Sequence, residues 1–207
     1  MKATKIILEG WESYQNKVAN LLLTPENEKM MQLQLAQIYQ TLGPVYEYEA
    51  SESIKVLLEV PVKIRGTVSR IIDVVIAHAR GRETSYYPIE LKCFRLLTRA
   101  GDGKRGAQNL GMYDYWEDVE NIEGYSKLPG YPRAFQFTLT DDPYYVTTQH
   151  KGAQVAVYST NVTRTGITGN LSQAIANRKG AIQLAGTYSM AGWQRLGGFH
   201  FIGQQAP

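Results

Sequence analysis

Three polar side chains stand where the sequence is otherwise apolar. Asp73 lies in the run Ile-Ile-Asp-Val-Val, and Glu90 and Lys92 alternate with apolar residues in Ile-Glu-Leu-Lys-Cys-Phe. Burying an unpaired carboxylate is costly, so Asp73 needs a partner of opposite charge. Side chains two residues apart on a strand point to the same face, which brings Glu90 and Lys92 together. These three residues are the first candidates for chemistry.

A tight turn is expected to bring these residues to one place. The apolar runs Val68–Ala79 and Tyr86–Phe94 predict two strands, and Gly81-Arg82 between them predicts the centre of a hairpin. Counting outward from this turn places Asp73 directly opposite Glu90. Residues opposed in this way have Cβ atoms about 4.5–5.5 Å apart.

Two carboxylates at that separation repel each other unless a positive charge lies between them. A divalent cation would remove the repulsion, and Mg²⁺ commonly takes one or two carboxylates together with water and substrate phosphate. Lys92, on the same strand face as Glu90, would then lower the pKa of a water molecule or stabilise negative charge on a phosphate. The pattern therefore favours metal-assisted phosphoryl chemistry.

Two further polar residues continue the buried faces of neighbouring helices. Thr24-Pro25 predicts a helix start, and Glu28 lies three residues before Met31, the first residue of the apolar stripe of that helix. Gln108 lies four residues before Met112 and continues the stripe of a later helix in the same way. Each also has a purely structural explanation. A glutamate in the first turn complements the helix dipole, and a glutamine there can satisfy the helix start.

The order of the expected elements indicates a mixed α/β sheet with helices on its faces. The expected elements are helices over about 8–23 and 25–42, strands over 54–64, 68–79 and 86–94, a helix over 107–123, strands over 134–140 and 154–158, and short glycine-separated strands through 182–202. Pro61 suggests that the strand over 54–64 lies at a sheet edge or contains a bulge.

Length and composition suggest a single soluble domain over residues 1–207. No stretch approaches the roughly 20 apolar residues that a membrane-spanning helix requires. The apolar run in Met1–Glu9 is too short for the core of a signal peptide, and Cys93 is the only cysteine. We therefore expect a cytoplasmic protein with no membrane contact.

The net charge of +3 is unevenly distributed along the chain. Segment 143–207 contains no acidic residue and five basic ones, which are Lys151, Arg164, Arg178, Lys179 and Arg195. This composition favours a nucleic-acid-binding part, with Arg178 and Lys179 as candidate contacts, although a basic solvated surface would have the same composition.

A glycine-rich basic loop follows the strand that carries Glu90 and Lys92. This loop, over residues 98–106, contains Arg99, Lys104 and Arg105. Their place directly after the candidate site makes these three side chains candidate phosphate contacts.

The run Ile-Ile-Asp73, followed after sixteen residues by Glu90-Leu91-Lys92, resembles the PD-(D/E)XK nuclease superfamily, whose members share the restriction-endonuclease-like fold. The resemblance covers residues 28–140. It implies that Asp73 and Glu90 bind Mg²⁺, or Mn²⁺ in its place, with support from Glu28. It also implies that Lys92 positions or activates the attacking water and that Gln108 lies near the site.

Two positions depart from the pattern of that superfamily. Ile72 replaces the proline that gives the family its name, and Tyr113 follows Gln108 by five residues where the exonuclease branch has a tyrosine four residues on.

The expected function is therefore Mg²⁺-dependent endonucleolytic hydrolysis of DNA, of restriction or defence type. Three alternatives remain open. The chain could be a repair or recombination exonuclease of the same superfamily, or a non-catalytic nucleic-acid-binding module on this fold. It could also be an unrelated α/β domain with Glu90 and Lys92 as a surface pair, although Asp73 then has no explanation. Because enzymes that cut both strands are frequently two-fold dimers, a homodimer is a further expectation.

Overall fold

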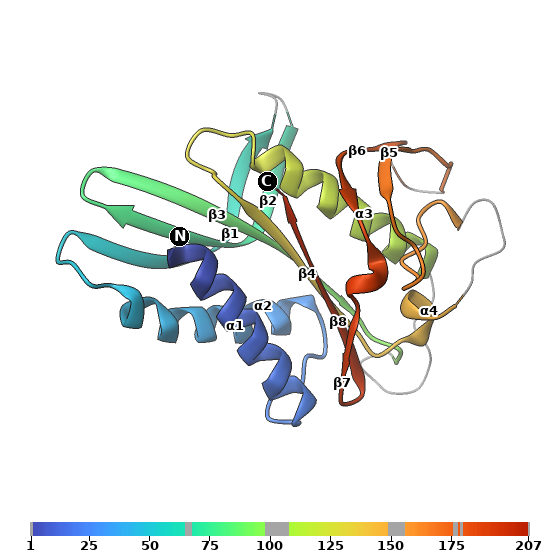
Figure 1. Cartoon of the computed structure of the whole chain (residues 1–207), viewed down its shortest axis with the longest axis horizontal. Coiled ribbons are helices and arrows are strands. Elements are labelled where there is room, and N and C mark those ends of the chain that lie inside the picture. The colour runs from blue at the N-terminus through green and yellow to red at the C-terminus, as the bar shows by residue number, and fades with distance from the viewer. Residues whose placement is uncertain are drawn as a thin grey trace.

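A six-stranded mixed sheet forms the centre of the molecule, with α1 and α2 on one face and α3 on the other (Figure 1). The structure is a computed structural model that describes residues 2–64, 68–97, 108–148, 156–175, 178 and 180–206. Its elements are α1 (Lys2–Ala19), α2 (Glu28–Leu42), η1 (Gly43–Tyr46), β1 (Glu52–Ile64), β2 (Val68–Arg80), β3 (Glu83–Phe94), α3 (Gln108–Tyr125), β4 (Ala134–Thr140), α4 (Pro143–Val146), β5 (Ile167–Leu171), β6 (Ile182–Tyr188), η2 (Met190–Gly192), β7 (Gln194–Leu196) and β8 (Phe199–Ala206).

The strands of the central sheet lie in the order β1-β2-β3-β4-β8-β7. All neighbours are antiparallel except β3 and β4, which are parallel and are joined by the segment that contains α3. Parallel strands need such a crossover, which explains why α3 covers one face of the sheet. β1 lies at an edge, as Pro61 predicts.

The side chains of β3 alternate between the two faces of the sheet. Tyr87, Ile89, Leu91 and Cys93 pack in the apolar core beneath α1 and α2. The residues between them point to the opposite face, where Glu90 meets the side chain of Tyr125 from α3. The predicted mixed α/β architecture is therefore confirmed, and β3 presents its polar positions to α3.

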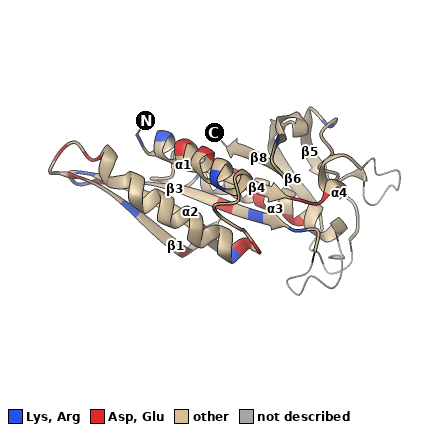
Figure 2. Cartoon of the chain, turned by 90° about the horizontal axis from the view of Figure 1, so that it is seen from below, with Lys and Arg blue, Asp and Glu red and all other residues tan. Residues whose placement is uncertain are grey.

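The C-terminal third of the chain packs onto the same helix. Both carboxylate oxygens of Glu123 in α3 accept hydrogen bonds from main-chain N–H groups of Ala185 and Gly186 in β6, at 2.7 and 2.6 Å. Strands β5 and β6 contain no charged residue (Figure 2), so the basic residues of segment 143–207 lie outside these two strands. None of the helices in the described ranges is long and apolar enough to cross a membrane.

The predicted starts and ends of the first two helices were partly wrong. The N-cap of α2 is Asn27, whose side chain accepts a hydrogen bond from Met30 N at 2.9 Å, and not Thr24. An asparagine is as good a cap as a threonine, so the sequence offered two starts. The first helix begins at Lys2 and ends at Ala19, because Ile6 and Ile7 are fully buried and extend its apolar face.

The strand predicted over 154–158 is wrong within its described part, since residue 156 is helical and residues 157–158 form a turn. The main-chain carbonyl of Tyr158 accepts a hydrogen bond from the indole of Trp116 at 2.9 Å, and its side chain is fully buried. Tyr158 is therefore buried as a single anchor within a turn. The predicted loop over 98–106 lies outside the described residues.

Gly10 in α1 allows the two N-terminal helices to approach closely. A Cβ atom at Gly10 would lie 2.3 Å from the ring of Tyr39, which is fully buried in α2. We expect Gly10→Ala to lower the free energy of unfolding by about 1–3 kcal/mol, because the overpacked ring must shift. Urea denaturation measures this. Gly198→Ala is the control, since a Cβ there meets no atom within 4 Å. An equal loss in both variants would contradict the close-packing explanation.

Glu52 ties the first helix to the sheet. Its side chain accepts hydrogen bonds from Lys2 in α1 at 2.6 Å and from His78 in β2 at 2.8 Å. These hydrogen bonds lower the pKa of Glu52 from 4.5 to about 2. A group with a lowered folded-state pKa stabilises the fold above its unfolded-state pKa, and this contribution disappears as the pH falls toward the folded-state value.

We therefore expect Glu52→Gln to reduce the acid sensitivity of the protein. The loss of stability between pH 4.5 and about 2 should be smaller in this variant than in the wild type, as measured by urea denaturation across that range. Glu49→Gln is the control, since Glu49 pairs with Arg80 on the exposed surface. The assignment of Glu52 fails if both variants retain the acid dependence of the wild type.

Candidate functional site

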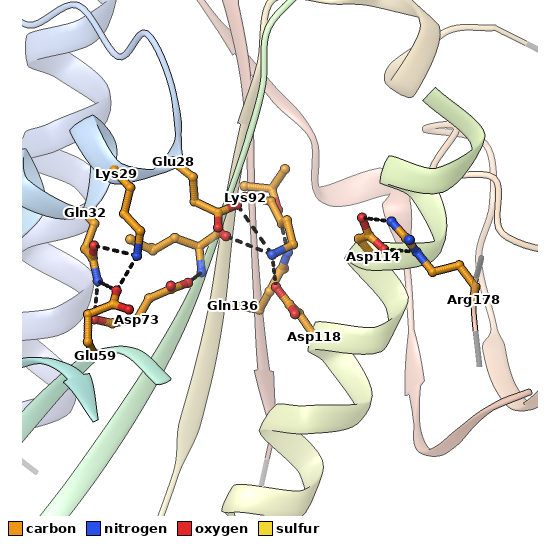
Figure 3. A network of polar contacts seen from close by, with 12 residues as sticks. Glu28, Lys29, Gln32, Glu59, Asp73, Lys92, Asp114, Asp118, Gln136 and Arg178 are labelled. Carbon is orange, nitrogen blue, oxygen red and sulfur yellow. Dashed lines mark hydrogen bonds and ion pairs between the residues drawn. The ribbon is translucent and has the colours of Figure 1, made fainter. Parts of the chain in front are cut away.

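Lys92 is held between carboxylates from two helices (Figure 3). Its Nζ lies 2.7 Å from Asp118 Oδ2 in α3 and 3.5 Å from Glu28 Oε2 at the start of α2. The Lys92 side chain is only 16% exposed. Burial by itself would lower the pKa of Lys92, but Asp118 and Glu28 more than offset this and raise the pKa above its usual value. Lys92 is therefore a fixed positive charge.

Glu90 lies beside it on the same face of β3 and is almost completely buried. The hydroxyl group of Tyr125 donates a hydrogen bond to Glu90 Oε1 at 2.6 Å. Burial first, and then the charges of Asp118 and Asp73, raise the pKa of Glu90 well above its usual value. Burial also raises the pKa of Asp118, against the opposing effect of Lys92. The site thus holds more acid groups than the single buried ammonium can neutralise.

Asp73 reaches β3 through the main chain and not through strand pairing. The predicted turn and register are confirmed from Arg80↔Glu83 to Val74↔Ile89, but the ladder ends there, one pair before Asp73 and Glu90. Asp73 Oδ2 instead accepts a hydrogen bond from Leu91 N at 2.8 Å. The predicted direct opposition of Asp73 and Glu90 is therefore wrong, and the Asp73 carboxylate lies against the main chain between Glu90 and Lys92.

The pairing of β3 explains why this N–H group is available. β3 pairs with β2 up to Ile89 and with β4 from Ile89 onward. Leu91 therefore lies beyond the β2 ladder, and its N–H group is satisfied by the side chain of Asp73. The two strands separate at the point where the candidate residues lie.

Gln108 does not join this cluster. Its side-chain amide lies 3.5 Å from Asp142 Oδ2. Gln108 precedes Asp118 by ten residues on α3, which is about 15 Å along a helix axis. The side chain cannot span that distance, so the predicted place of Gln108 near the site is wrong.

The predicted nucleic-acid contacts have a mixed outcome. Arg178 forms a bidentate ion pair with the carboxylate of Asp114 in α3, at 2.6 and 2.7 Å, so the charge of Arg178 is already paired. The other four predicted contacts, Arg99, Lys104, Arg105 and Lys179, lie outside the described residues.

The three predicted metal ligands do not form a preorganised metal-binding site; they are Glu28, Asp73 and Glu90. In the part of the chain that the structure describes, no three Asp, Glu, His or Cys side chains gather closely enough to hold a metal ion. Glu28 is instead paired with the Lys92 ammonium, at 3.5 Å.

The donor atoms nevertheless suit a hard cation with two protein carboxylates. Within the described ranges, neither Asp73 Oδ1 nor Glu90 Oε2 takes part in a hydrogen bond. Gln136, which is fully buried and opposite Glu90 in the β3–β4 register, has an Oε1 atom with no hydrogen-bond partner among the described residues. Mg²⁺ commonly takes one or two carboxylates and completes its coordination with water and substrate oxygens, so this donor set fits the ion.

Three site residues were missed from the sequence, namely Asp118, Tyr125 and Gln136. Asp118 lies four residues before the buried Ile122, and Gln136 lies in a strand whose seven residues are all buried. The argument that singled out Asp73, a polar residue at an apolar position, also applies to both of them.

Comparison with known proteins finds no matching protein family, no similar curated protein and no similar solved structure.

The buried ion pair of Lys92 predicts a strong effect on stability. Removing one partner from a buried pair leaves an uncompensated charge, so Asp118→Asn should lower the free energy of unfolding by about 3 kcal/mol. Asp114→Asn, one turn earlier on α3, is the matched control and should cost about 1 kcal/mol or less, because the Asp114–Arg178 pair is partly exposed. Urea denaturation of both variants measures the difference, and equal losses would show that Asp118 does not bear a buried charge.

Proposed function

We propose that the chain is a Mg²⁺-dependent endonuclease that hydrolyses phosphodiester bonds of DNA and has a restriction-endonuclease-like fold. One observation carries this proposal. The Asp73 carboxylate is bonded to the main chain of Leu91, which places it beside Glu90 and Lys92 where β2 and β3 separate. Two carboxylates and one ammonium group from adjacent strands are thereby brought close together. Metal-assisted phosphoryl transfer uses side chains of these types.

Asp73 and Glu90 would hold the metal ion through the oxygens that make no hydrogen bond within the described residues. Mg²⁺, when bound, supplies Lewis-acid activation of the scissile phosphodiester. Tyr125 fixes the orientation of the Glu90 carboxylate through its hydrogen bond at 2.6 Å. The raised pKa of Glu90 is consistent with this role, because burial and then repulsion by Asp118 and Asp73 raise it, and a bound cation would offset that repulsion.

Lys92 acts as a positive charge and not as a general base. Asp118 and Glu28 raise its pKa, so the amine keeps its proton at neutral pH. A fixed ammonium stabilises the negative charge that develops on a phosphate during attack, and it orients a water molecule by donating a hydrogen bond. Asp118 holds the ammonium in place at 2.7 Å.

Substrate would approach the site from the N-terminal end of α2. The side chains there are the exposed ones, at 37% for Glu28 and 66% for Lys29, whereas the residue Glu90 is only 4% exposed. α3 covers the opposite side, where Asp118 is 8% exposed. A DNA strand therefore reaches the Asp73 carboxylate before the deeper Glu90.

A non-catalytic DNA-binding module is the second candidate, and the Lys92 ion pairs favour it. The ammonium of Lys92 compensates part of the acidic charge by itself, at 2.7 Å from Asp118 and 3.5 Å from Glu28. A chain that had lost metal binding would need such compensation.

Cleavage of DNA separates these candidates. Closed-circular and linear DNA are incubated with the protein and Mg²⁺ or Mn²⁺, and products are followed by gel electrophoresis. We expect nicking or linearisation of closed circles, abolition by EDTA, and a loss of about a hundredfold or more in Asp73→Asn and in Glu90→Gln. Glu83→Gln is the matched control, since Glu83 is an exposed carboxylate of the same hairpin.

Each other outcome has a definite meaning. Degradation from DNA ends alone would indicate the exonuclease, and DNA binding without cleavage by either ion would indicate the binding module. Cleavage by Asp73→Asn at the rate of the wild type would refute the site.

A further inference from the structure

Glu59 has a strained backbone in the middle of β1. Its φ angle is +53°, in the left-handed region that side chains other than glycine rarely adopt. Glu59 lies between the paired positions Leu58↔Val74 and Val60↔Ile72, so it faces Asp73 without pairing with it. Its side chain is 47% exposed, so burial of the side chain does not explain the strain.

Gln32 of α2 connects this strained residue to Asp73. Its Nε2 atom donates to Glu59 Oε1 and to the main-chain oxygen of Asp73, both at 2.6 Å (Figure 3). Gln32 is only 5% exposed, and Lys29, one turn earlier, also contacts the Glu59 carboxylate. One buried amide thus binds both strands at the same level of the sheet.

The alternation of side chains reverses at this level in both strands. Val74 packs beneath α1 and α2, whereas Ile72 packs beneath α3, although strict alternation would put both on one face. In β1, Val56 and Val60 are separated in the same way. The reversal lies at Asp73 and Glu59, the two residues that Gln32 binds.

We infer that Gln32 and Glu59 are positioning residues for the proposed nuclease site, acting together as a clamp that turns Asp73 toward β3. The inference rests on the function proposed above for its consequence, but its geometry is independent of it. A regular β2 would keep the two-residue alternation through Asp73. The clamp holds the Asp73 carbonyl on the α2 side, which directs the carboxylate to Leu91 N.

The Leu91 amide reports the position of Asp73 without any need for activity. We expect Gln32→Met, which keeps the length of the side chain but removes the donor, to speed hydrogen exchange of the Leu91 amide by about tenfold relative to the Ile76 amide. Ile76, in the core part of β2, corrects for a change in global stability. Gln37→Met, on the exposed side of α2, is the matched control.

Metal affinity supplies the second measurement. Titration of the protein with Mn²⁺ should show binding weakened by about tenfold to a hundredfold in Gln32→Met and unchanged in Gln37→Met. If the wild type binds no Mn²⁺, the proposed metal site fails, yet the exchange of the Leu91 amide still tests the clamp.

Glu59→Gly distinguishes a clamp from an ordinary stabilising contact. Glycine adopts a φ angle of +53° without strain, so the melting temperature should not fall, while exchange of the Leu91 amide should still rise. A Leu91-to-Ile76 exchange ratio that stays at the wild-type value in both Gln32→Met and Glu59→Gly would overturn the inference.

Discussion

The positive charge of Lys92, enclosed among carboxyl groups, is the interaction on which the rest of the candidate site depends. Asp118 and Glu28 belong to helices that cover opposite faces of the sheet, and Lys92 meets both of them. A buried ammonium is tolerated only with such partners, because desolvation would otherwise remove its proton. The ion pairs therefore connect α2, β3 and α3.

The separation of two strands makes this arrangement possible. The pairing of β3 with β2 ends at Ile89, and beyond this point β3 pairs with β4. The N–H group of Leu91 therefore needs another acceptor, and the Asp73 carboxylate supplies it. The acid is thereby placed by a main-chain hydrogen bond, which is more directional than attraction between charged side chains. Unpaired backbone at this point of the sheet is thus used to position a functional group.

An excess of acid over base is the electrostatic signature of the site. Asp73, Glu90, Asp118 and Glu28 influence one another, and burial raises the pKa of Glu90 and of Asp118. A cation bound between Asp73 and Glu90 would relieve this repulsion, whereas a protein that binds no cation would retain it. The proposed nuclease and the non-catalytic alternative differ in this one physical respect.

The sequence by itself determined strands β1 to β4 of the central sheet, the Gly81-Arg82 turn and the register of the hairpin as far as Val74↔Ile89, because periodicity and turn chemistry are local properties. It also identified Glu28, Asp73, Glu90 and Lys92 as unusual. Only the tertiary structure decided that Asp118 reaches Lys92, that Gln108 does not, and that Asp73 bonds to Leu91 N. Those contacts depend on how α3 crosses the sheet and on where two strands part. Both are set by the packing of residues far apart in the chain, which no local pattern records.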